Sequence, residues 1–116
     1  MSEVVRIAFP TGDIGGLDDK VYPRFARAPT LTIVEVDEAF NIINVKVLRN
    51  PAIDAARGAA VRVAELLSDE SVSVVATASL GPHASAVLQN LGVRVVYVEA
   101  NAAVRGALKK VRETLK

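Results

Sequence analysis

Cationic side chains that could hold a multiply charged anion are concentrated between Thr11 and Pro29. This segment contains Lys20, Arg24 and Arg27, and ammonium and guanidinium groups are strong hydrogen-bond donors to anions. The same segment also contains three aspartates, Asp13, Asp18 and Asp19. These carboxylates could instead neutralise the cations in a solvated charge network. The sequence therefore leaves two interpretations of the segment open, an anion site and an internal network.

A second candidate anion site is the turn from Ala78 to Ala84. It follows a buried apolar run and opens a predicted helix, whose first backbone N–H groups and positive dipole end favour a negative ligand. Gly81 would allow a ligand to approach the backbone closely. His83, the only histidine of the chain, could donate to an anion or coordinate a metal that brings its other ligands. The alternative is an ordinary strand-to-helix turn, with Gly81 for conformation and Pro82 as the first helical residue.

The composition excludes several kinds of chemistry. The chain has no cysteine, so disulfides, thiolate metal sites, cysteine nucleophiles and iron-sulfur clusters ligated by its own cysteines cannot form. With 14 basic and 13 acidic residues, it has no general field that would attract nucleic acid or an anionic membrane. Residues 1–6 lack the pattern of a signal peptide, and no apolar run is long enough to span a bilayer. We expect a cytoplasmic protein with neither nucleic acid nor a membrane as partner.

Catalytic patterns are largely missing. The glycines between Gly12 and Gly16 do not fit GxGxxG, and the chain contains no phosphate-binding P-loop, GxSxG or HExxH motif. Ser79 or Ser85 could pair with His83, but nothing specifies an orienting acid or an oxyanion hole. A two-metal nuclease needs converging carboxylates, and the first and fourth predicted strands contain none. We therefore expect a protein that is not an enzyme, with a hydrolase or nuclease as the least favoured alternative.

The elements that must position these residues follow from the spacing of apolar side chains. We predict five strands and three helices in the order strand, strand, strand, helix, strand, helix, strand, helix. The strands span 4–9, 31–36, 42–48, 72–78 and 93–98; the helices are about 55–68, one between Pro82 and Gly92, and one marked by Val104, Leu108, Val111 and Leu115. Asn101 is expected to cap the last helix. Residues 10–29 show no periodicity, and a loop of that length is more often functional than idle.

Pairing rules place the candidate sites at one edge of one sheet. Short connections make the second strand antiparallel to the first and third, and strands joined through helices run parallel. Apolar and polar residues alternate in the segment 42–48, so one face of the third strand is exposed to solvent and this strand is expected at a sheet edge. If the fourth strand adds beside the first, a topological switch lies between them, where open α/β sheets bind ligands. The segments 11–29, 49–57, 78–83 and 99–101 then share that edge.

The loop from Gly16 to Pro29 resembles a landmark of the dinitrogenase iron-molybdenum cofactor biosynthesis family. Its sequence is GLDDKVYPRFARAP, and the family includes the NifX-like proteins, the carboxyl-terminal domain of NifB and the cofactor-binding domain of NafY. The chain also resembles later landmarks of the family, in the same order, at Asn50-Pro51, Gly58-Ala59-Ala60, Leu80-Gly81-Pro82-His83-Ala84 and Gly92-Val93. The resemblance covers nearly the whole chain and implies a single NifX-like cofactor-binding domain over residues 1–116.

This resemblance implies an α/β, three-layer ribonuclease-H-like fold with a mixed five-stranded sheet of order 3-2-1-4-5, strand 2 antiparallel and helices on both faces. It also implies binding and delivery of an iron-molybdenum or other metal-sulfur cofactor as cargo, with cofactor-assembly proteins as partners. Many members, including cofactor binders, read His-Phe-Gly where this chain has Arg24-Phe25-Ala26, so the loop imidazole expected to ligate the cofactor is absent. Arg24 stays protonated and can pair with the negative charge of a cluster.

We predict a non-enzymatic binding protein that resembles carriers of metal-sulfur cofactors. Arg24 and Arg27 would balance ligand charge, and Phe25 would cover an apolar side of the ligand. The predicted cofactor-binding residues are Thr11, Asp13, Arg24, Phe25, Arg27, Asn50, Gly81, Pro82 and His83. The alternative is a small regulatory or interaction domain that binds a nucleotide, an anion or a protein partner at the same sheet edge, and it predicts no metal after anaerobic reconstitution.

Overall fold

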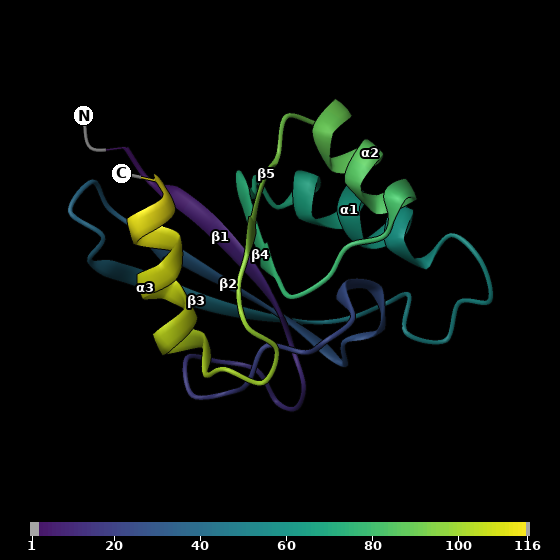
Figure 1. Ribbon diagram of the computed structural model, residues 1–116, viewed down its shortest axis with the longest axis horizontal. Coiled ribbons are helices and arrows are strands. Elements are labelled where there is room, and N and C mark those ends of the chain that lie inside the picture. Colours follow the sequence, from purple (N-terminus) through teal and green to yellow (C-terminus); the bar gives the residue numbers. More distant parts are fainter. Residues whose placement is uncertain (1–2, 116) are drawn as a thin grey trace.

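Five strands form one mixed sheet in the computed structural model, which describes residues 3–115 (Figure 1). The strands are β1 (Val5–Thr11), β2 (Thr30–Val36), β3 (Ile42–Arg49), β4 (Val74–Thr77) and β5 (Arg94–Tyr97). The helices are α1 (Ala59–Asp69), α2 (Pro82–Asn90) and α3 (Val104–Leu115), and a short 3₁₀ turn, η1, spans Phe25–Arg27. Over the described residues, no helix combines the length and apolar character needed to cross a membrane.

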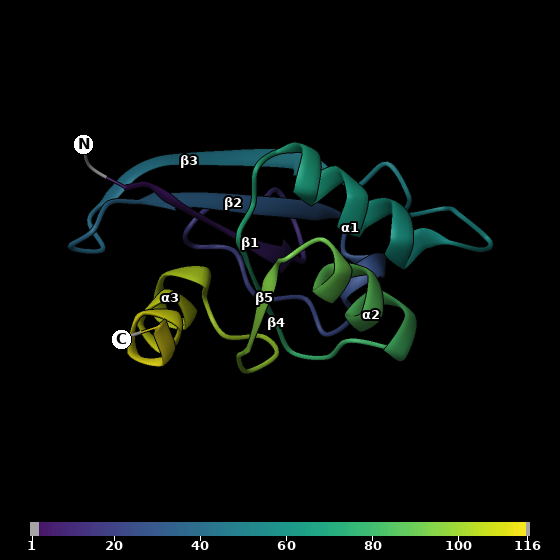
Figure 2. The ribbon, with the colours of Figure 1, turned by 90° about the horizontal axis from the view of Figure 1, so that it is seen from above.

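The strand order β3-β2-β1-β4-β5 confirms the predicted topology. β2 pairs antiparallel with β1 and β3, whereas β4 pairs parallel with β1 and β5. A hairpin can join antiparallel neighbours, but parallel neighbours need a crossover such as α1 or α2. These two helices lie on one face of the sheet and α3 lies on the other (Figures 1 and 2). The expected three-layer, ribonuclease-H-like arrangement is therefore confirmed.

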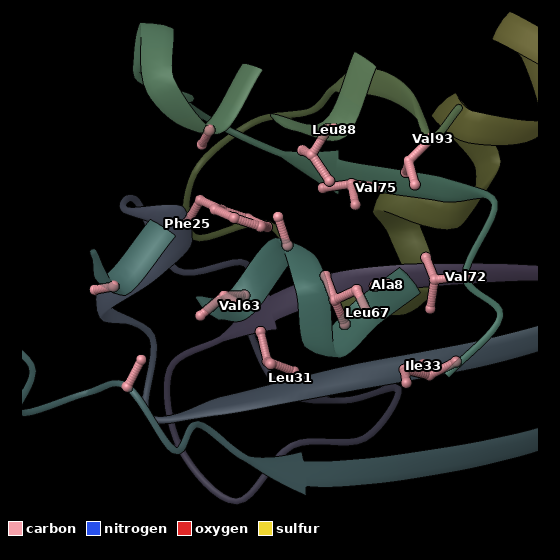
Figure 3. Close-up of a cluster of buried hydrophobic side chains, with 14 residues drawn as sticks. Ala8, Phe25, Leu31, Ile33, Val63, Leu67, Val72, Val75, Leu88 and Val93 are labelled. Carbon is pink, nitrogen blue, oxygen red and sulfur yellow. The ribbon is translucent and has the colours of Figure 1, made fainter. Parts of the chain in front are cut away.

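Branched aliphatic side chains fill the layer between the sheet and the helices α1 and α2 (Figure 3). Leu31 of β2 and Val75 of β4 belong to the same buried cluster as Leu67 of α1 and Leu88 of α2, and all four are 0% exposed. Full burial of such a side chain stabilises a fold by about 1.5–3 kcal/mol. The core is therefore built with only 4% aromatic residues in the chain.

The opposite face of the sheet is covered by α3. Val104, Leu108 and Val111 repeat at helical spacing, so they form one apolar stripe. They share a second buried cluster with Ile7 and Phe9 of β1. α3 thereby fixes the end of the chain against the strand that precedes the long loop.

The start of α1 differs from the prediction. The helix begins at Ala59 and not near Ala55. Gly58, just before it, has a φ of 72°, a left-handed conformation that a right-handed helix cannot continue through. Residues 51–57 form turns and bends instead. The helical spacing of the alanines in this region therefore predicted a start of α1 that is four residues too early.

Asn101 does not cap α3 as predicted. It has a φ of 67° and lies three positions before Val104, the first helical residue. The first two N–H groups of the helix donate instead to main-chain carbonyls of the long loop. Val104 N donates to Asp19 O and Arg105 N donates to Leu17 O, both at 2.9 Å. Tertiary contacts thus satisfy donors that a side-chain cap would otherwise satisfy.

Strand bounds also differ from the prediction, most clearly in β1, β4 and β5. β1 continues through Pro10 to Thr11. Its parallel pairing with β4 is confined to Ile7 and Ala8, so the proline lies beyond that ladder and removes no hydrogen bond from it. β4 and β5 are only four residues long. Val72, two residues before β4, is buried but donates its N–H to Leu67 O at the end of α1 and not to a neighbouring strand.

Candidate functional site

The loop between β1 and β2 is held in place by the connection between β5 and α3. Val21 N donates to Ala102 O and Asn101 N donates to Val21 O, both at 2.8 Å. Tyr22 N donates back to Pro10 O at 2.8 Å. Segments far apart in the sequence therefore lie side by side at the carboxyl end of β1 (Figure 1). Tertiary hydrogen bonds therefore order this loop, although its sequence shows no helical or strand periodicity.

Asp19 folds the first half of this loop around its carboxylate. One oxygen, Oδ2, accepts from Asp13 N at 2.9 Å and from Gly15 N at 2.8 Å. The other, Oδ1, accepts from Lys20 N at 2.7 Å. Three backbone donors therefore share this negative charge, and hydrogen bonds to a charged acceptor are among the stronger ones in proteins. Asp19 shapes the loop and is already engaged within it.

Gly15 is required by its conformation and by its surroundings. Its φ is +86°, and a Cβ atom here would lie 2.5 Å from Val47 Cγ1 of β3. The next residue, Gly16, donates its N–H to Thr32 Oγ1 of β2 at 3.0 Å. The loop therefore lies directly on two strands, which fixes its position relative to the sheet.

Thr11, a predicted site residue, is used inside the sheet. Its Oγ1 hydrogen-bonds to the hydroxyls of Thr30 at 2.6 Å and Thr32 at 3.0 Å. Its exposed fraction is 0%, and buried hydroxyls need such partners. The structure therefore places Thr11 beneath the loop and not on its outer surface.

A groove of about 820 Å³, which we term the loop groove, opens on the outer surface of this loop. It is lined by Gly12, Asp13, Ile14, Gly15, Asp18, Asp19, Lys20, Tyr22, Pro23, Arg24 and Asn101. Pockets that hold small molecules and cofactors usually measure about 300–1,000 Å³. Of the residues predicted from the sequence, Asp13 and Arg24 line the groove.

The loop groove is less negative than its three aspartates suggest. Asp19 is engaged with backbone N–H groups, and Asp18 Oδ1 lies 3.5 Å from Arg105 Nη2 in an exposed ion pair. The lining also contains Asp13 and two exposed cations, Lys20 and Arg24. Exposed cationic side chains can reorient toward a ligand, and a guanidinium donates in a planar fork that suits multiply charged anions. The groove can therefore offer two cationic donors.

Tyr22 and Asn101 line the loop groove but are not among the predicted site residues. The phenol and the amide add neutral hydrogen-bonding groups to the two cations. For Asn101, the available signal was the expectation that residues 99–101 reach the same sheet edge as the loop. Nothing in the sequence marks Tyr22 beyond its place in that loop.

Asn50, Arg27 and Phe25 do not line the loop groove; their contacts hold the segment that follows Arg24. Asn50 Nδ2 donates to Ala26 O at 3.0 Å and to Ala28 O at 2.9 Å, while its Oδ1 accepts from Ala52 N at 2.9 Å. Arg27 Nη1 donates to the carbonyls of residues 53 and 55. Phe25 is only 4% exposed and belongs to the core cluster under α1 and α2 (Figure 3). The observed contacts of all three residues are structural.

Gly81, Pro82 and His83 form the exposed beginning of α2 and do not line the loop groove. Pro82 is the first helical residue, as predicted. Ser79, just before this turn, donates its hydroxyl to Pro23 O at 2.6 Å, which ties the turn to the long loop. The predicted segments do reach the same edge of the sheet (Figure 1), but only part of them forms the groove.

Metal-ligating side chains are sparse at this edge. Among residues 3–115, no group of three or more His, Asp or Glu side chains is arranged to hold a metal ion. The lining of the loop groove offers carboxylate, amide and phenol oxygens but no imidazole or thiolate. Metals in sulfur-rich clusters prefer softer ligands than these oxygens. The groove is therefore better suited to the charge and outer atoms of a cluster than to its metal ions.

Comparison with known proteins gives one family. The family model described as "Dinitrogenase iron-molybdenum cofactor" matches residues 3–114. A search of curated proteins found no match.

Solved structures with similar folds include the orange protein from Desulfovibrio gigas in its apo form. It is 30% identical in sequence, with a TM-score of 0.83 over 98% of this chain and 92% of that chain. A NifB-like Thermotoga protein of the DUF35 family is 29% identical, with a TM-score of 0.73 over 94% and 88% of the two chains. The protein PH0822 is 22% identical, with a TM-score of 0.78 over 95% and 92%; this last likeness concerns the fold alone.

Proposed function

Because this chain belongs to the dinitrogenase iron-molybdenum cofactor family, we propose that it is a non-enzymatic carrier that binds a negatively charged metal-sulfur cofactor, or its precursor, in the loop groove. The observation that carries this proposal is that six residues between Asp18 and Arg24, inside the segment that resembles a family landmark, line a groove of about 820 Å³. Proteins that assemble or receive the cofactor would be its partners. The iron-molybdenum cofactor is the cargo that the family name favours.

In this proposal Arg24 and Lys20 hold the negative charge of the cargo. Arg24 lines the groove and is exposed, so its guanidinium can donate to a cluster sulfide or to an organic acid attached to the cluster. Tyr22 and Asn101 supply neutral donors beside these cations. Asp13 in the same lining weakens the attraction for an anion, which favours reversible binding over permanent binding.

The donor set of the loop groove indicates how such a cargo would be held. Without an imidazole or thiolate in the lining, the protein would make no soft bond to the metals, and the cargo would keep its own ligands. His83 lies outside the lining, at the exposed start of α2. Binding through charge and hydrogen bonds alone suits a carrier, because release requires no metal–protein bond to break.

Anaerobic reconstitution with ferrous iron, sulfide and molybdate tests this function. Wild-type protein should retain iron or molybdenum after desalting and show visible absorption bands. Arg24→Glu should retain about tenfold less, because a lost hydrogen bond to a charged group is worth about 1.5–3 kcal/mol. Arg62→Glu makes the same charge change on the exposed face of α1 and should behave as wild type. Absence of retained metal in wild type, or equal loss in both variants, would contradict the proposal.

A regulatory or interaction domain that binds a nucleotide or a simple anion is the second candidate. The absence of soft metal ligands from the lining of the loop groove favours it. It predicts that no metal survives desalting, whereas ATP, phosphate or molybdate raises the melting temperature of wild type and not of Arg24→Glu. The same protein samples therefore distinguish the two functions.

A further inference from the structure

β5 lies at an open edge of the sheet, with β4 on one side and no strand of residues 3–115 on the other. In Figure 1 it lies in front, between α3 and α2, and Figure 2 shows no element covering its outer side. A second groove, of about 420 Å³, runs between β5 and α3; we term it the β5 groove. It is lined by Tyr97, Val98, Glu99, Ala102, Gly106, Ala107 and Lys110. An open strand edge beside a groove is the arrangement that accepts extended peptides as an added strand.

Gly106 lines the β5 groove, although nothing within the described fold requires a glycine there. It is the third residue of α3, and its φ lies outside the left-handed region. A Cβ atom at this position would have no neighbouring atom within 4 Å. Glycine weakens helices relative to almost every other residue. A close approach by another chain would explain why the position is left without a side chain.

The two edges of the sheet differ in how they are protected. At the far edge, the pairing of β3 with β2 has a register shift between Glu35 and Val36 of β2, and β3 carries a lysine, Lys46, near its middle. Bulges and lysines are common devices against strand addition. β5 has a regular register with β4 and presents Tyr97, which is 55% exposed. Exposed tyrosines are enriched where proteins bind one another. β5 is therefore the edge better suited to a partner.

The charge around the β5 groove selects an acidic partner. Residues 94–116 contain six of the basic residues and two of the acidic ones, whereas residues 1–93 contain eight basic and eleven acidic residues. Arg94 begins β5, and Lys110 lines the groove beside one acidic residue, Glu99. α3, which forms one wall of the groove, also carries the exposed cations Lys109 and Arg112. Opposite charges steer association and discriminate against partners of like charge. The part of the sequence that forms β5 and α3 is therefore its most basic part.

We propose that the β5 edge binds an extended, acidic segment of a partner protein as a sixth strand. An apolar side chain of that segment would lie in the β5 groove, over Gly106 and against Tyr97, with acidic residues near Arg94 and Lys110. β5 is only four residues long, so main-chain pairing is short and the groove must contribute to affinity. The β5 groove shares no lining residue with the loop groove. This proposal therefore does not depend on whether a metal-sulfur cargo binds in the loop groove.

Fluorescence anisotropy with two synthetic peptides tests this site. The acidic probe is fluorescein-Glu-Asp-Val-Thr-Val-Thr-Glu-Asp, and its counterpart replaces the four acids with Lys and Arg. Wild type should bind the acidic probe, and Gly106→Gln should weaken binding by about tenfold or more by filling the groove. Lys110→Glu should also weaken it. Ala86→Gln, on the exposed face of α2, should bind as wild type does.

The folding control is built into the same variant. Glutamine favours helices more than glycine does, so Gly106→Gln should have a melting temperature equal to or above that of wild type. Its loss of binding would then come from the filled groove and not from unfolding. Any one of four results overturns the proposal: no binding of the acidic probe, equal binding of both probes, Gly106→Gln binding like Ala86→Gln, or a wild-type dimer in sedimentation that Gly106→Gln dissociates. In the last case the occupant is a second copy of the chain.

Discussion

Asn50 connects two segments that have no regular pairing with each other. It is 1% exposed, and all its observed hydrogen bonds are to main-chain atoms. Its amide nitrogen serves two carbonyls at and after η1, and its oxygen serves the N–H of Ala52. Buried carbonyls and N–H groups cost free energy when they lose such partners. The side chain therefore supports the wall that carries Arg24.

Replacing Asn50 with alanine should lower the free energy of unfolding by about 2–4 kcal/mol, because two buried and one partly buried main-chain groups lose a partner at about 1 kcal/mol or more each. Urea denaturation followed by circular dichroism measures this change. Asn44→Ala removes an exposed amide bonded to Glu35 at 3.2 Å and should cost less than about 1 kcal/mol. Equal effects of the two substitutions would show that the buried network contributes little.

Two adjacent glycines separate backbone strain from steric contact. Gly15 and Gly16 both have positive φ, at 86° and 99°, but only Gly15 has atoms close to a Cβ position. Gly16→Ala should therefore cost only the strain of a left-handed alanine, about 1–2 kcal/mol. Gly15→Ala should cost about 1–3 kcal/mol more because it clashes with Val47. Melting temperatures of the two variants test this order, and a reversed order would contradict the described packing of the loop.

The β2–β3 hairpin is closed by the carboxylate of Asp37. It accepts hydrogen bonds from Asn41 N and Ala39 N, each at 2.9 Å, and from Asn41 Nδ2 at 3.2 Å. The N–H of Asn41 contributes most to holding the pKa of Asp37 below its ordinary value, because it stabilises the charged form. An aspartate with a lowered pKa stabilises the fold above its unfolded pKa, near 4, and this stabilisation is lost as the pH falls through the lower, folded value.

Asp37→Asn should accordingly destabilise the hairpin at pH 7 and have a smaller effect near pH 3. The measurement is the difference in melting temperature between wild type and variant across this range. Asp54→Asn, an equal charge change at an exposed position between β3 and α1, is the control. A difference for Asp37→Asn that stays constant from pH 7 to pH 3 would contradict a role for its ionised form.

Most elements could be predicted from the sequence because apolar runs and helical spacing reflect local burial. The five strands and the three helices follow from such patterns, whereas their order in the sheet was predicted from pairing rules and from the family resemblance. The start of α1 could not be predicted, since the alanines before Gly58 continue the helical spacing although the glycine is left-handed. The first turn of α3 was mispredicted for another reason: its N–H groups bond to carbonyls of Asp19 and Leu17, and no local pattern reveals such distant partners.

The sequence predicted which segment carries the candidate site, but only some of the residues that line it. Topology placed the long loop at the carboxyl end of β1, and Asp13 and Arg24 do line the loop groove. Charge and residue type alone could not show that Thr11, Asn50 and Arg27 are used in internal hydrogen bonds. Polar residues that brace a loop and polar residues that could contact a ligand look alike in a sequence; only their partners in space separate them.

At the scale of the molecule, we propose that residues 1–116 fold as one domain, as the family resemblance implies. Both buried clusters contain residues of β1 and β4, so neither layer of helices has a sheet of its own. Unfolding should therefore be a single cooperative transition. Urea curves followed by far-ultraviolet circular dichroism and by amide NMR signals from α2 and α3 should coincide. Separate midpoints for the two helices would contradict this expectation.

The distribution of aromatic rings gives the protein its own optical reporters. The chain contains no tryptophan and only two tyrosines; one, Tyr22, lines the loop groove, and the other, Tyr97, lines the β5 groove. Near-ultraviolet emission of the unlabelled protein therefore originates at the two surfaces of interest. Single Tyr→Phe replacements would leave one emitter each, so occupancy of either surface could be followed separately without attaching a dye.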